Sequence, residues 1–521
     1  MDLPTLLGEA FRQLGPKLFN QLEGSFALAI YEPAKRRLTL VRDATGQRPL
    51  VFARTPDGAR FGSIPSDLQL ALQVDLDDLG AFLAGSAARS TTTPLCGVEQ
   101  VRPGEMVVLT PGACERRYWW QPEVGPSAHD RSRDYAGEYR SHLTRAVEPW
   151  LGQGLTACQL SGGWDSGAVT GAAVSLRGTA NVRAYTAVPA APIQGKAMRH
   201  TNVDETGLAS ASASALGVTH QLINARAEPF ALARWFHEVA QSPLVSPFPL
   251  TWWNAIRDQA RADGATAVLT GEMGNLSLNA GGLSALAVLI AQRRLASAWR
   301  EARLLARAGT IRWRGAAAAV LSGHVPDTLL QWFGERLAGG PPARPETFLL
   351  ERGTGDRRAE TLPADAYEAR LAMIRETESG VHRVLSERHW DLIEADPTAD
   401  RALIEWSLTL PPEAFLKNGE LRPMARRALQ GWLPDPVLNS HLRGLQSADW
   451  YQMTSAAECR HVLAEIREHQ PVREFLDIAA LDRAISEWPS SDWNSAAHYA
   501  RFRVGVVGAL CTGLFIARFA A

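Results

Sequence analysis

The segment Gln159-Leu-Ser-Gly-Gly-Trp-Asp-Ser-Gly-Ala-Val169 joins a short apolar run, Leu155–Leu160, to a helix that is expected to begin near Ser166. Consecutive glycines let the backbone approach an anion closely and turn its N–H groups inward. The helix N-terminus adds unpaired N–H donors and a partial positive charge. Serine hydroxyls add further donors, and a carboxylate here is suited to hold Mg²⁺ on phosphate oxygens. We therefore predict a pyrophosphate site made by Ser161, Gly162, Gly163, Asp165 and Ser166.

This loop differs from the better-known phosphate-binding loops. No Gly-Lys-Ser/Thr follows the glycines, so it is not a Walker A loop, and it does not match GxGxxG. A glycine-rich turn without a ligand is the alternative interpretation. The serines and the aspartate, placed directly after an apolar strand, favour a ligand site.

The chain around this loop alternates between strand and helix patterns from Ala136 onward. The further strand candidates are Val182–Val188, His220–Ile223 and Ala265–Thr270. Strands that alternate with helices predict a parallel sheet covered by helices on both faces. The α/β fold class rests on this pattern.

The first 120 residues have a different pattern, with short apolar runs separated by turns. We predict a β-rich domain over residues 1–120, a polar linker over 121–135, and a second domain over 136–521. Gly339–Asp365 is rich in Gly, Pro and charge and is expected to be a flexible surface excursion. The strand candidates of the first domain are Ser25–Glu32, Arg37–Arg42, Pro49–Arg54, Glu105–Thr110 and Arg116–Trp120.

Length and composition limit the functional classes. A chain of 521 residues usually forms more than one domain, and 46% hydrophobic with 21% charged residues is typical of a globular protein. The net charge of −1 gives no global basic footprint, so we expect no nucleic-acid partner. Five scattered cysteines indicate free thiols in a reducing cytoplasm. The apolar run 504–521 is interrupted by Arg518 and is expected to be a buried helix rather than a membrane span.

Near the C-terminus, apolar residues fall on one helical stripe. Arg422, Arg426 and Arg427 point away from this stripe, and we expect them to form a solvated face. The stripe consists of Leu421, Met424, Ala425, Ala428, Leu429 and Trp432.

Several blocks resemble known proteins. The Ser161–Ser166 loop resembles the PP-loop of N-type ATP pyrophosphatases, which implies AMP transfer from ATP. The whole chain resembles the asparagine synthetase superfamily, which implies an N-terminal glutaminase-like (Ntn-type) domain and a synthetase domain of the adenine-nucleotide-alpha-hydrolase type with a helical C-terminal part. The matching blocks are Leu22–Ala29, Arg42–Pro49, the PP-loop, Asp204-Glu205, Leu269–Asn275, Asp396–Leu408 and Leu410–Pro412.

Three departures from that superfamily point to one branch. Position 2 is Asp2 and no cysteine precedes Cys96, so the glutaminase nucleophile is missing; an incorrectly assigned start codon is the competing explanation. Asn275 stands where the family has a second metal-binding aspartate, which leaves Asp165, with Glu272 as a further candidate, to bind Mg²⁺. Arg443-Gly-Leu-Gln-Ser-Ala-Asp-Trp450 is similar to the corresponding block of lasso-peptide cyclases.

The resemblance implies ATP and Mg²⁺ as cofactors and a leaderless core peptide as substrate. An Asp or Glu side chain of that peptide would be adenylated, and the peptide's N-terminal amine would then close a macrolactam. A leader peptidase and a leader-binding protein are the implied partners.

The resemblance also implies roles for individual residues. Gly271 would contact the nucleotide, and Arg443 would offset charge at the α-phosphate. Glu394 is the candidate base, with a salt-bridge role as its alternative. The peptide cavity would be lined by Trp164, Trp252, Trp253 and Trp450, for which core packing is the alternative.

Two other functions remain open from the sequence. The first is a small-molecule amide synthetase of the asparagine or β-lactam type, which uses the same chemistry. The second is a catalytically inactive scaffold that binds a peptide, because the metal-binding turn is altered.

Overall fold

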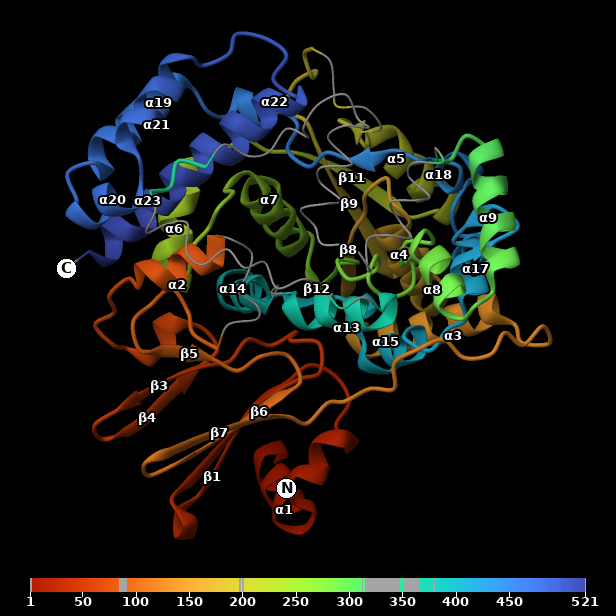
Figure 1. The fold of residues 1–521 in the computed structure, drawn as a ribbon, viewed down its shortest axis with the longest axis horizontal. Helices are drawn as coiled ribbons and strands as arrows, with labels where there is room; N and C mark the ends of the chain where they lie inside the picture. Colours follow the sequence, from red (N-terminus) through yellow and green to blue (C-terminus); the bar gives the residue numbers. More distant parts are fainter. Residues whose placement is uncertain are drawn as a thin grey trace.

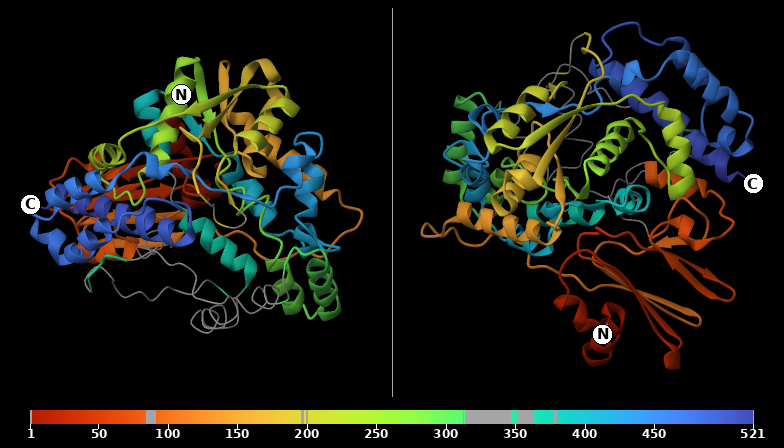
Figure 2. Two further views of the ribbon diagram at one scale, coloured as in Figure 1. Left: turned by 90° about the horizontal axis from the view of Figure 1, so that it is seen from above. Right: turned by 180° about the vertical axis from the view of Figure 1, so that it is seen from behind.

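The computed structural model describes residues 2–83, 91–195, 198, 201–311, 313, 347–350, 363, 365–377 and 380–520. The excursion predicted at Gly339–Asp365 lies almost entirely outside these residues. The chain forms an N-terminal β-rich region, a central α/β region and a C-terminal group of helices, which lie side by side in Figures 1 and 2.

The N-terminal region contains two antiparallel sheets, in the orders β1-β2-β6-β7 and β4-β3-β5. Helix α1 packs on the first sheet through Phe11, Phe19, Val41 and Met106. All five predicted strands are present; Arg37–Arg42 and Glu105–Thr110 have the predicted bounds, and the other three have shifted ends. The elements are α1 (Leu3–Leu14), β1 (Ala27–Glu32), β2 (Arg37–Arg42), β3 (Val51–Thr55), β4 (Gly58–Gly62), α2 (Leu76–Ala81), β5 (Val98–Gln100), β6 (Glu105–Thr110) and β7 (Ala113–Tyr118).

A five-stranded parallel sheet in the order β11-β9-β8-β12-β13 organises the central region. This confirms the α/β fold class, and the sheet is covered on both faces as predicted. The strands are β8 (Leu155–Gln159), β9 (Val182–Val188), β11 (Thr219–Asn224), β12 (Ala265–Leu269) and β13 (Ile393–Ala395), the last of which was not predicted.

The helices divide between the two faces of this sheet. Small side chains of α4, such as Ala168 and Ala172, pack against Cys158 and Ala184 on one face. On the other face, Ile256 of α7 packs against Tyr185. The helices of the first face are α3 (Tyr135–Val147), α4 (Trp164–Arg177), α5 (Thr206–Leu216), α8 (Ser284–Ala291), α9 (Leu295–Arg307), α13 (Ala366–Glu376), α15 (Arg401–Ser407), α16 (Pro412–Phe415), α17 (Pro423–Leu429) and α18 (Asp435–Leu438). The helices of the second face are α7 (Phe248–Ala262) and α14 (Gly380–Trp390).

The C-terminal helices form a separate layer with α6 (Figure 1). One continuous helix, Ala496–Phe519, is long and apolar enough to cross a membrane, but 83% of its apolar window is buried inside the protein. It therefore packs as a core helix, and its middle part, Tyr499–Val506, is π-helical. The other elements are α6 (Pro229–Ala240), α19 (Ala456–Ile466), α20 (Gln470–Phe475), α21 (Ile478–Ser486), α22 (Ala496–His498) and α23 (Val507–Phe519).

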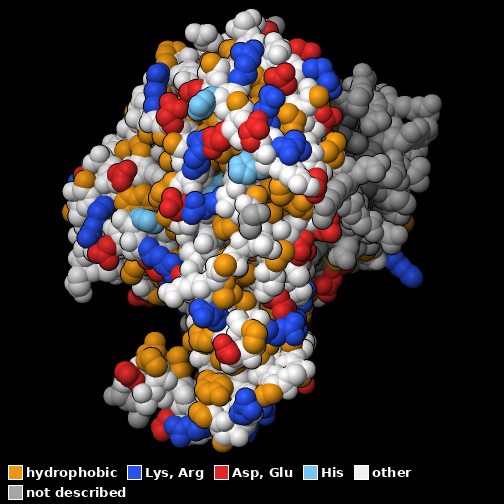
Figure 3. Space-filling view, turned by 90° about the vertical axis from the view of Figure 1, so that its left-hand side faces the viewer, with side chains coloured by type: hydrophobic (Ala, Val, Ile, Leu, Met, Phe, Trp, Pro, Cys, Tyr) orange, Lys and Arg blue, Asp and Glu red, His pale blue; other side chains and the backbone are white. Residues whose placement is uncertain are grey.

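The N-terminal region shares an apolar core with the C-terminal helices. Leu68, Leu79 and Val98 belong to the same buried cluster as Phe475 and Phe515. Polar contacts also join the N-terminal region to the central region, since Thr45 Oγ1 donates to the Ala399 carbonyl at 2.9 Å and Arg388 pairs with Asp67 at 2.8 Å. Figure 3 shows the narrower N-terminal lobe below the rest of the protein, with basic and acidic side chains intermixed over the coloured part of this face.

Candidate nucleotide-binding site

The PP-loop lies at the carboxyl end of β8, between the central strand of the sheet and α4. Helix α4 begins at Trp164, two residues before the predicted start, and its N-cap residue Gly163 provides no side-chain cap. The Ser161 and Ser166 hydroxyls lie 2.9 Å apart, and the Gly163 N–H donates to Ser161 Oγ at 3.1 Å. The loop therefore has a defined shape that places the uncapped end of α4 beside two hydroxyls.

A carboxylate already lies against this loop. The Gly162 N–H donates to Glu205 Oε1 at 3.1 Å. The backbone of Gly444 approaches the same side chain so closely that a Cβ there would lie 2.5 Å from Glu205 Cδ. Burial raises the pKa of Glu205, against the hydrogen bond from Gly162. Glu205 thus occupies a position that a phosphate oxygen could take, and it shows that this N–H faces an anion.

Asp165 is held in place by the segment that follows β12. Its Oδ1 accepts a hydrogen bond from Asn279 Nδ2, and Asn279 Oδ1 accepts one from Tyr139 Oη at 3.3 Å. A Cβ at Gly271 would lie 2.9 Å from the Asp165 carbonyl carbon, and one at Gly274 would overlap the Asp165 carboxylate. The absence of a side chain at Gly271 and Gly274 therefore leaves the space that Asp165 occupies. Burial raises the pKa of Asp165 to about 6, although Asn279 and Arg422 oppose the shift.

Glu272 follows Gly271 directly and is exposed. Its side chain is 39% exposed, yet protein surrounds it closely enough for desolvation to raise its pKa to about 7. Arg383 Nη2 lies 3.2 Å from Glu272 Oε2 and opposes this shift. Asn275, the residue in the family's metal position, is exposed.

The donor set fits Mg²⁺ only in part. Among the described residues, no three His, Cys, Asp or Glu side chains are grouped so that they could hold a metal ion. Asp165 offers one hard oxygen ligand that is already oriented, and Glu272 is the other predicted carboxylate on the adjoining turn. Mg²⁺ commonly keeps several waters and binds through one or two carboxylates plus substrate phosphates. These residues therefore fit a metal that arrives with a nucleotide better than a metal held by the protein alone.

Glu394 lies in a closed environment. Glu394 is 2% exposed, and its Oε2 accepts hydrogen bonds from Arg257 Nε at 2.9 Å and from Ser386 Oγ at 2.5 Å. Burial favours a raised pKa for this carboxyl, but Arg257, Arg383 and Ser386 hold the pKa below its ordinary value. The salt-bridge role that we gave as the alternative describes this geometry.

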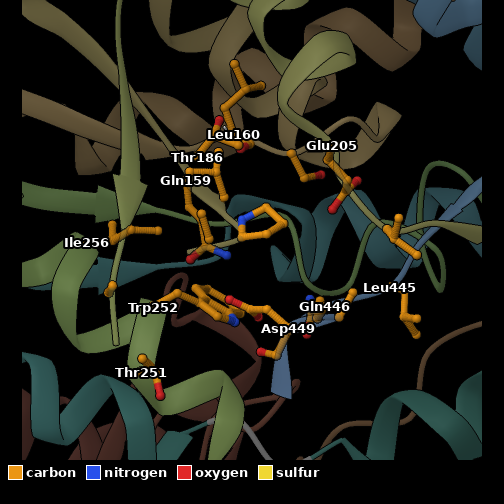
Figure 4. Close-up of a pocket in the computed structure, with 18 of the residues that line it drawn as sticks. Gln159, Leu160, Thr186, Glu205, Thr251, Trp252, Ile256, Leu445, Gln446 and Asp449 are labelled. Carbon is orange, nitrogen blue, oxygen red and sulfur yellow. Dashed lines mark hydrogen bonds between the residues drawn. The ribbon is translucent and has the colours of Figure 1, made fainter. Parts of the chain in front are cut away.

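An open pocket adjoins the PP-loop at the carboxyl ends of β8 and β9 (Figure 4). The pocket is open to solvent, and it contains about 710 Å³ of space when the solvent at its mouth is included. Glu205 projects into it from above in Figure 4, and Trp252 lies opposite. One wall is the block that follows Gly444, namely Leu445, Gln446, Ser447, Ala448 and Asp449.

The other predicted residues occupy different places. Arg443 is exposed on the two-residue strand β16 (Arg443–Gly444), which pairs with β10 (Thr201–Asn202) just before the pocket wall begins. Trp450 and Trp253 are buried in apolar clusters, so they follow the core-packing alternative. Trp164 is half-buried, and its Nε1 donates to the Val437 carbonyl at 3.0 Å.

The solvated face predicted for three arginines is wrong for two of them. The guanidinium carbons of Arg422 and Arg426 each lie 5.6 Å from the centroid of the Trp164 ring, and only Arg427 is exposed. Sequence reasoning also gave no site role to Glu205 or Asn279. Two local signals were available. Pro423 follows Arg422 and marks it as the residue before a helix, and Glu205 stands at the start of α5.

Comparisons with known proteins give the following matches. Residues 138–505 match a family model described as "Asparagine synthase", and residues 4–120 match one described as "Glutamine amidotransferase domain". "Asparagine synthetase [glutamine-hydrolyzing] 3" of Bacillus subtilis (strain 168) is 28% identical over 159 residues, which are 29% of this chain and 25% of that protein. The matched part thus spans about a quarter of that relative.

A solved structure titled "Structure of the allosteric regulatory enzyme of purine biosynthesis" is 12% identical and covers 50% of this chain and 49% of its own. Its TM-score is 0.16, which is too low to support an argument.

Proposed function

Because the chain belongs to the asparagine synthase family, whose members are ATP-dependent amide ligases, we propose that it activates a carboxylate as an acyl-adenylate and joins it to an amine. One observation carries this proposal. A loop with an anion at its N–H adjoins an open pocket at the carboxyl ends of two parallel strands. Ligands of open α/β sheets bind at that edge.

We further propose that the substrate is a ribosomal core peptide and that the product is a lasso-type macrolactam. The support is that the block from Arg443 to Trp450, which resembles that branch, supplies five consecutive residues of the pocket wall. The second candidate is a small-molecule amide synthetase, which the similarity to asparagine synthetase 3 favours.

In the first step, a substrate carboxylate oxygen attacks the α-phosphorus, and the bond to the β-phosphate oxygen breaks. Pyrophosphate leaves with that electron pair, and Ser161, Ser166 and the N-terminus of α4 bind its charge. Asp165, with Glu272 as a second candidate, would hold Mg²⁺, which supplies charge neutralisation on the phosphates. Arg443 is exposed and lies two residues before Leu445, where the pocket wall begins, and it would offset charge at the α-phosphate.

In the second step, the amine attacks the acyl carbon, loses a proton and expels AMP. A base for this step must be reachable and must have a pKa near the working pH. Glu394 is enclosed by its hydrogen-bond donors, whereas the side chain of Glu272 is 39% exposed and desolvation raises its pKa to about 7. Glu272 is therefore the better candidate for the base, an assignment that leaves Mg²⁺ to Asp165, the ATP phosphates and water.

The test is exchange of labelled pyrophosphate into ATP, with different carboxylates supplied in turn. Exchange that depends on a peptide with a free N-terminus and an internal Asp or Glu, followed by loss of one water from its mass, supports the macrolactam. Exchange with free aspartate and not with the peptide would favour the small-molecule synthetase. Peptide binding without any exchange would leave only the scaffold function.

The proposal includes a leader peptidase and a leader-binding protein as partners, no nucleic acid, and a cytoplasmic location. It also includes an N-terminal region without glutaminase activity. Burial and the neighbouring Asp75 raise the pKa of Cys96, which is the opposite of what a nucleophilic thiol needs. Incubation with glutamine should release no glutamate, and measurable release would contradict this part of the proposal.

A further inference from the structure

Arg422 has an unusual backbone conformation beside the PP-loop. Its φ of 56° and ψ of 44° are left-handed, a region that non-glycine residues seldom occupy. The Arg422 N–H donates to the Phe415 carbonyl at 2.7 Å, and Pro423 opens α17 directly after it. Such strained residues persist where surrounding contacts fix them, and they gather at functional sites.

This conformation directs the side chain onto the ring of Trp164, the first residue of α4. The ring is fixed, because its Nε1 donates to the Val437 carbonyl at 3.0 Å. A guanidinium held over an aromatic face by a cation–π contact does not use its N–H groups in that contact, so they can bind another partner. Arg422 is therefore held beside the loop with its hydrogen-bonding edge available.

Arg422 differs from Arg426 in how its charge is compensated. Arg426 makes a cation–π contact with the same ring, but it pairs with Glu420 at 2.8 Å and donates to Asn439 at 2.9 Å. Within the described residues, no carboxylate lies within salt-bridge distance of Arg422. Its charge reaches Asp165, whose pKa it helps to lower against burial. A half-buried cation without a paired anion stands next to the predicted phosphate cradle.

We propose that Arg422 is a further catalytic residue that contacts the pyrophosphate leaving group. This inference rests on the proposed function, since it concerns the same reaction. As the α-phosphorus–oxygen bond breaks, the bonding electrons go to the departing oxygen and negative charge grows on pyrophosphate. A guanidinium presents a rigid fork of N–H donors that matches phosphate oxygens, and it stays charged throughout the working pH range.

The experiment measures binding of pyrophosphate with Mg²⁺, and of AMP, by calorimetry. We expect Arg422→Gln to weaken pyrophosphate binding about 10- to 100-fold, the loss expected for one charge-assisted contact, and to leave AMP binding unchanged. Arg422→Lys should bind pyrophosphate with an affinity between those of the unmodified protein and Arg422→Gln, because lysine keeps the positive charge but lacks the forked pair of N–H donors. The matched control is Arg427→Gln, the exposed arginine of the same helix, which should bind both ligands like the unmodified protein.

The outcomes separate this inference from the proposed function. If the unmodified protein binds neither ATP nor pyrophosphate, the proposed function fails. If it binds pyrophosphate and Arg422→Gln binds it equally well, only the role of Arg422 is overturned. Should that variant not fold, phenylglyoxal labelling of the unmodified protein decides. Pyrophosphate should then protect Arg422 and leave Arg427 reactive, and equal labelling of both would overturn the inference.

Discussion

Asp165 and Glu394 are two carboxylates that flank the same strand, β12, since one follows β8 and the other lies on β13. Around Asp165 is a PP-loop cluster of Tyr139, Asn279 and Arg422, which supplies one amide donor and a distant cation. Around Glu394 is a core ion-pair cluster, in which the Arg257 guanidinium donates directly to the carboxylate.

The pKa values of Asp165 and Glu394 shift in opposite directions. Desolvation favours the neutral form of both, but only Glu394 has a guanidinium at hydrogen-bond distance. The pKa of Asp165 therefore rises to about 6, while that of Glu394 falls below its ordinary value. A site that must receive a metal or a nucleotide leaves its charge uncompensated until the ligand arrives. A structural pair compensates its charge within the fold.

The strongest test of this contrast is removal of the Asp165 charge. Asp165→Asn should lower pyrophosphate exchange by at least about 10³-fold, equivalent to about 4 kcal/mol of transition-state stabilisation, because the metal loses its oriented ligand. Exchange assays at saturating ATP and Mg²⁺ measure this. Retained turnover would remove Asp165 from the site and leave the two clusters functionally alike.

The next effect falls on stability rather than activity. Arg257→Ala should lower the free energy of unfolding by about 3 kcal/mol, because Glu394 would remain buried without the guanidinium that pairs with it. Arg261→Ala is the control on the same helix. Its partner Asp391 is 85% exposed, so its loss should change stability by less than about 0.5 kcal/mol. Denaturant unfolding of both variants decides whether the core ion-pair cluster is structural.

The position of the Asp165 carboxylate can be tested without changing its charge. Gly274→Ala places a methyl group where that carboxylate lies, so exchange should fall about 10²-fold, the loss expected for a displacement of about 1 Å. Gly281→Ala is the control, since open space surrounds that Cβ position. Equal activity of the two variants would show that the loop tolerates movement of Asp165.

The smallest predicted effect is a gain in stability. The folded-state pKa of Asp165, about 6, lies above its ordinary value of 3.8, so the folded protein binds this proton more tightly than the unfolded chain. Ionisation of Asp165 therefore lowers stability as the pH rises from about 4 to about 6, and the loss stays constant above that. Without Mg²⁺, Asp165→Asn should be more stable than the unmodified protein by about 2 kcal/mol at pH 7, allowing for solvent in the cleft. The two proteins should unfold alike near pH 4, and equal stability at pH 7 would contradict the uncompensated charge.

Most of the strands, and the strand–loop–helix unit around Ser161, follow from the sequence because their signals are local. Alternation, turn residues and paired glycines act within a few positions of the elements they specify. Helix α1 was missed although its signals are present. Asp2 caps it by accepting from the Thr5 N–H at 3.0 Å, and Pro4 lies in the first turn.

The remaining parts of the site depend on tertiary contacts. Nothing near Glu205 in the sequence shows that its carboxylate meets Gly162, 43 residues earlier. Arg422 and Arg427 look alike in a helical projection, yet a left-handed backbone turns one onto Trp164. Burial with Arg257 likewise separates Glu394 from the acids of the cleft. Local patterns specify which elements form, whereas the environment of each charge is set by segments that are far apart in the chain.

The apolar cluster that joins the N-terminal region to the C-terminal helices also bears on how such proteins evolve. Leu68 and Val98 are buried against the same set of side chains as Phe475 and Phe515. Deleting the first 120 residues would therefore expose apolar side chains of the C-terminal helices to solvent and favour aggregation. Loss of the region as a whole would therefore require changes to the surface that it covers.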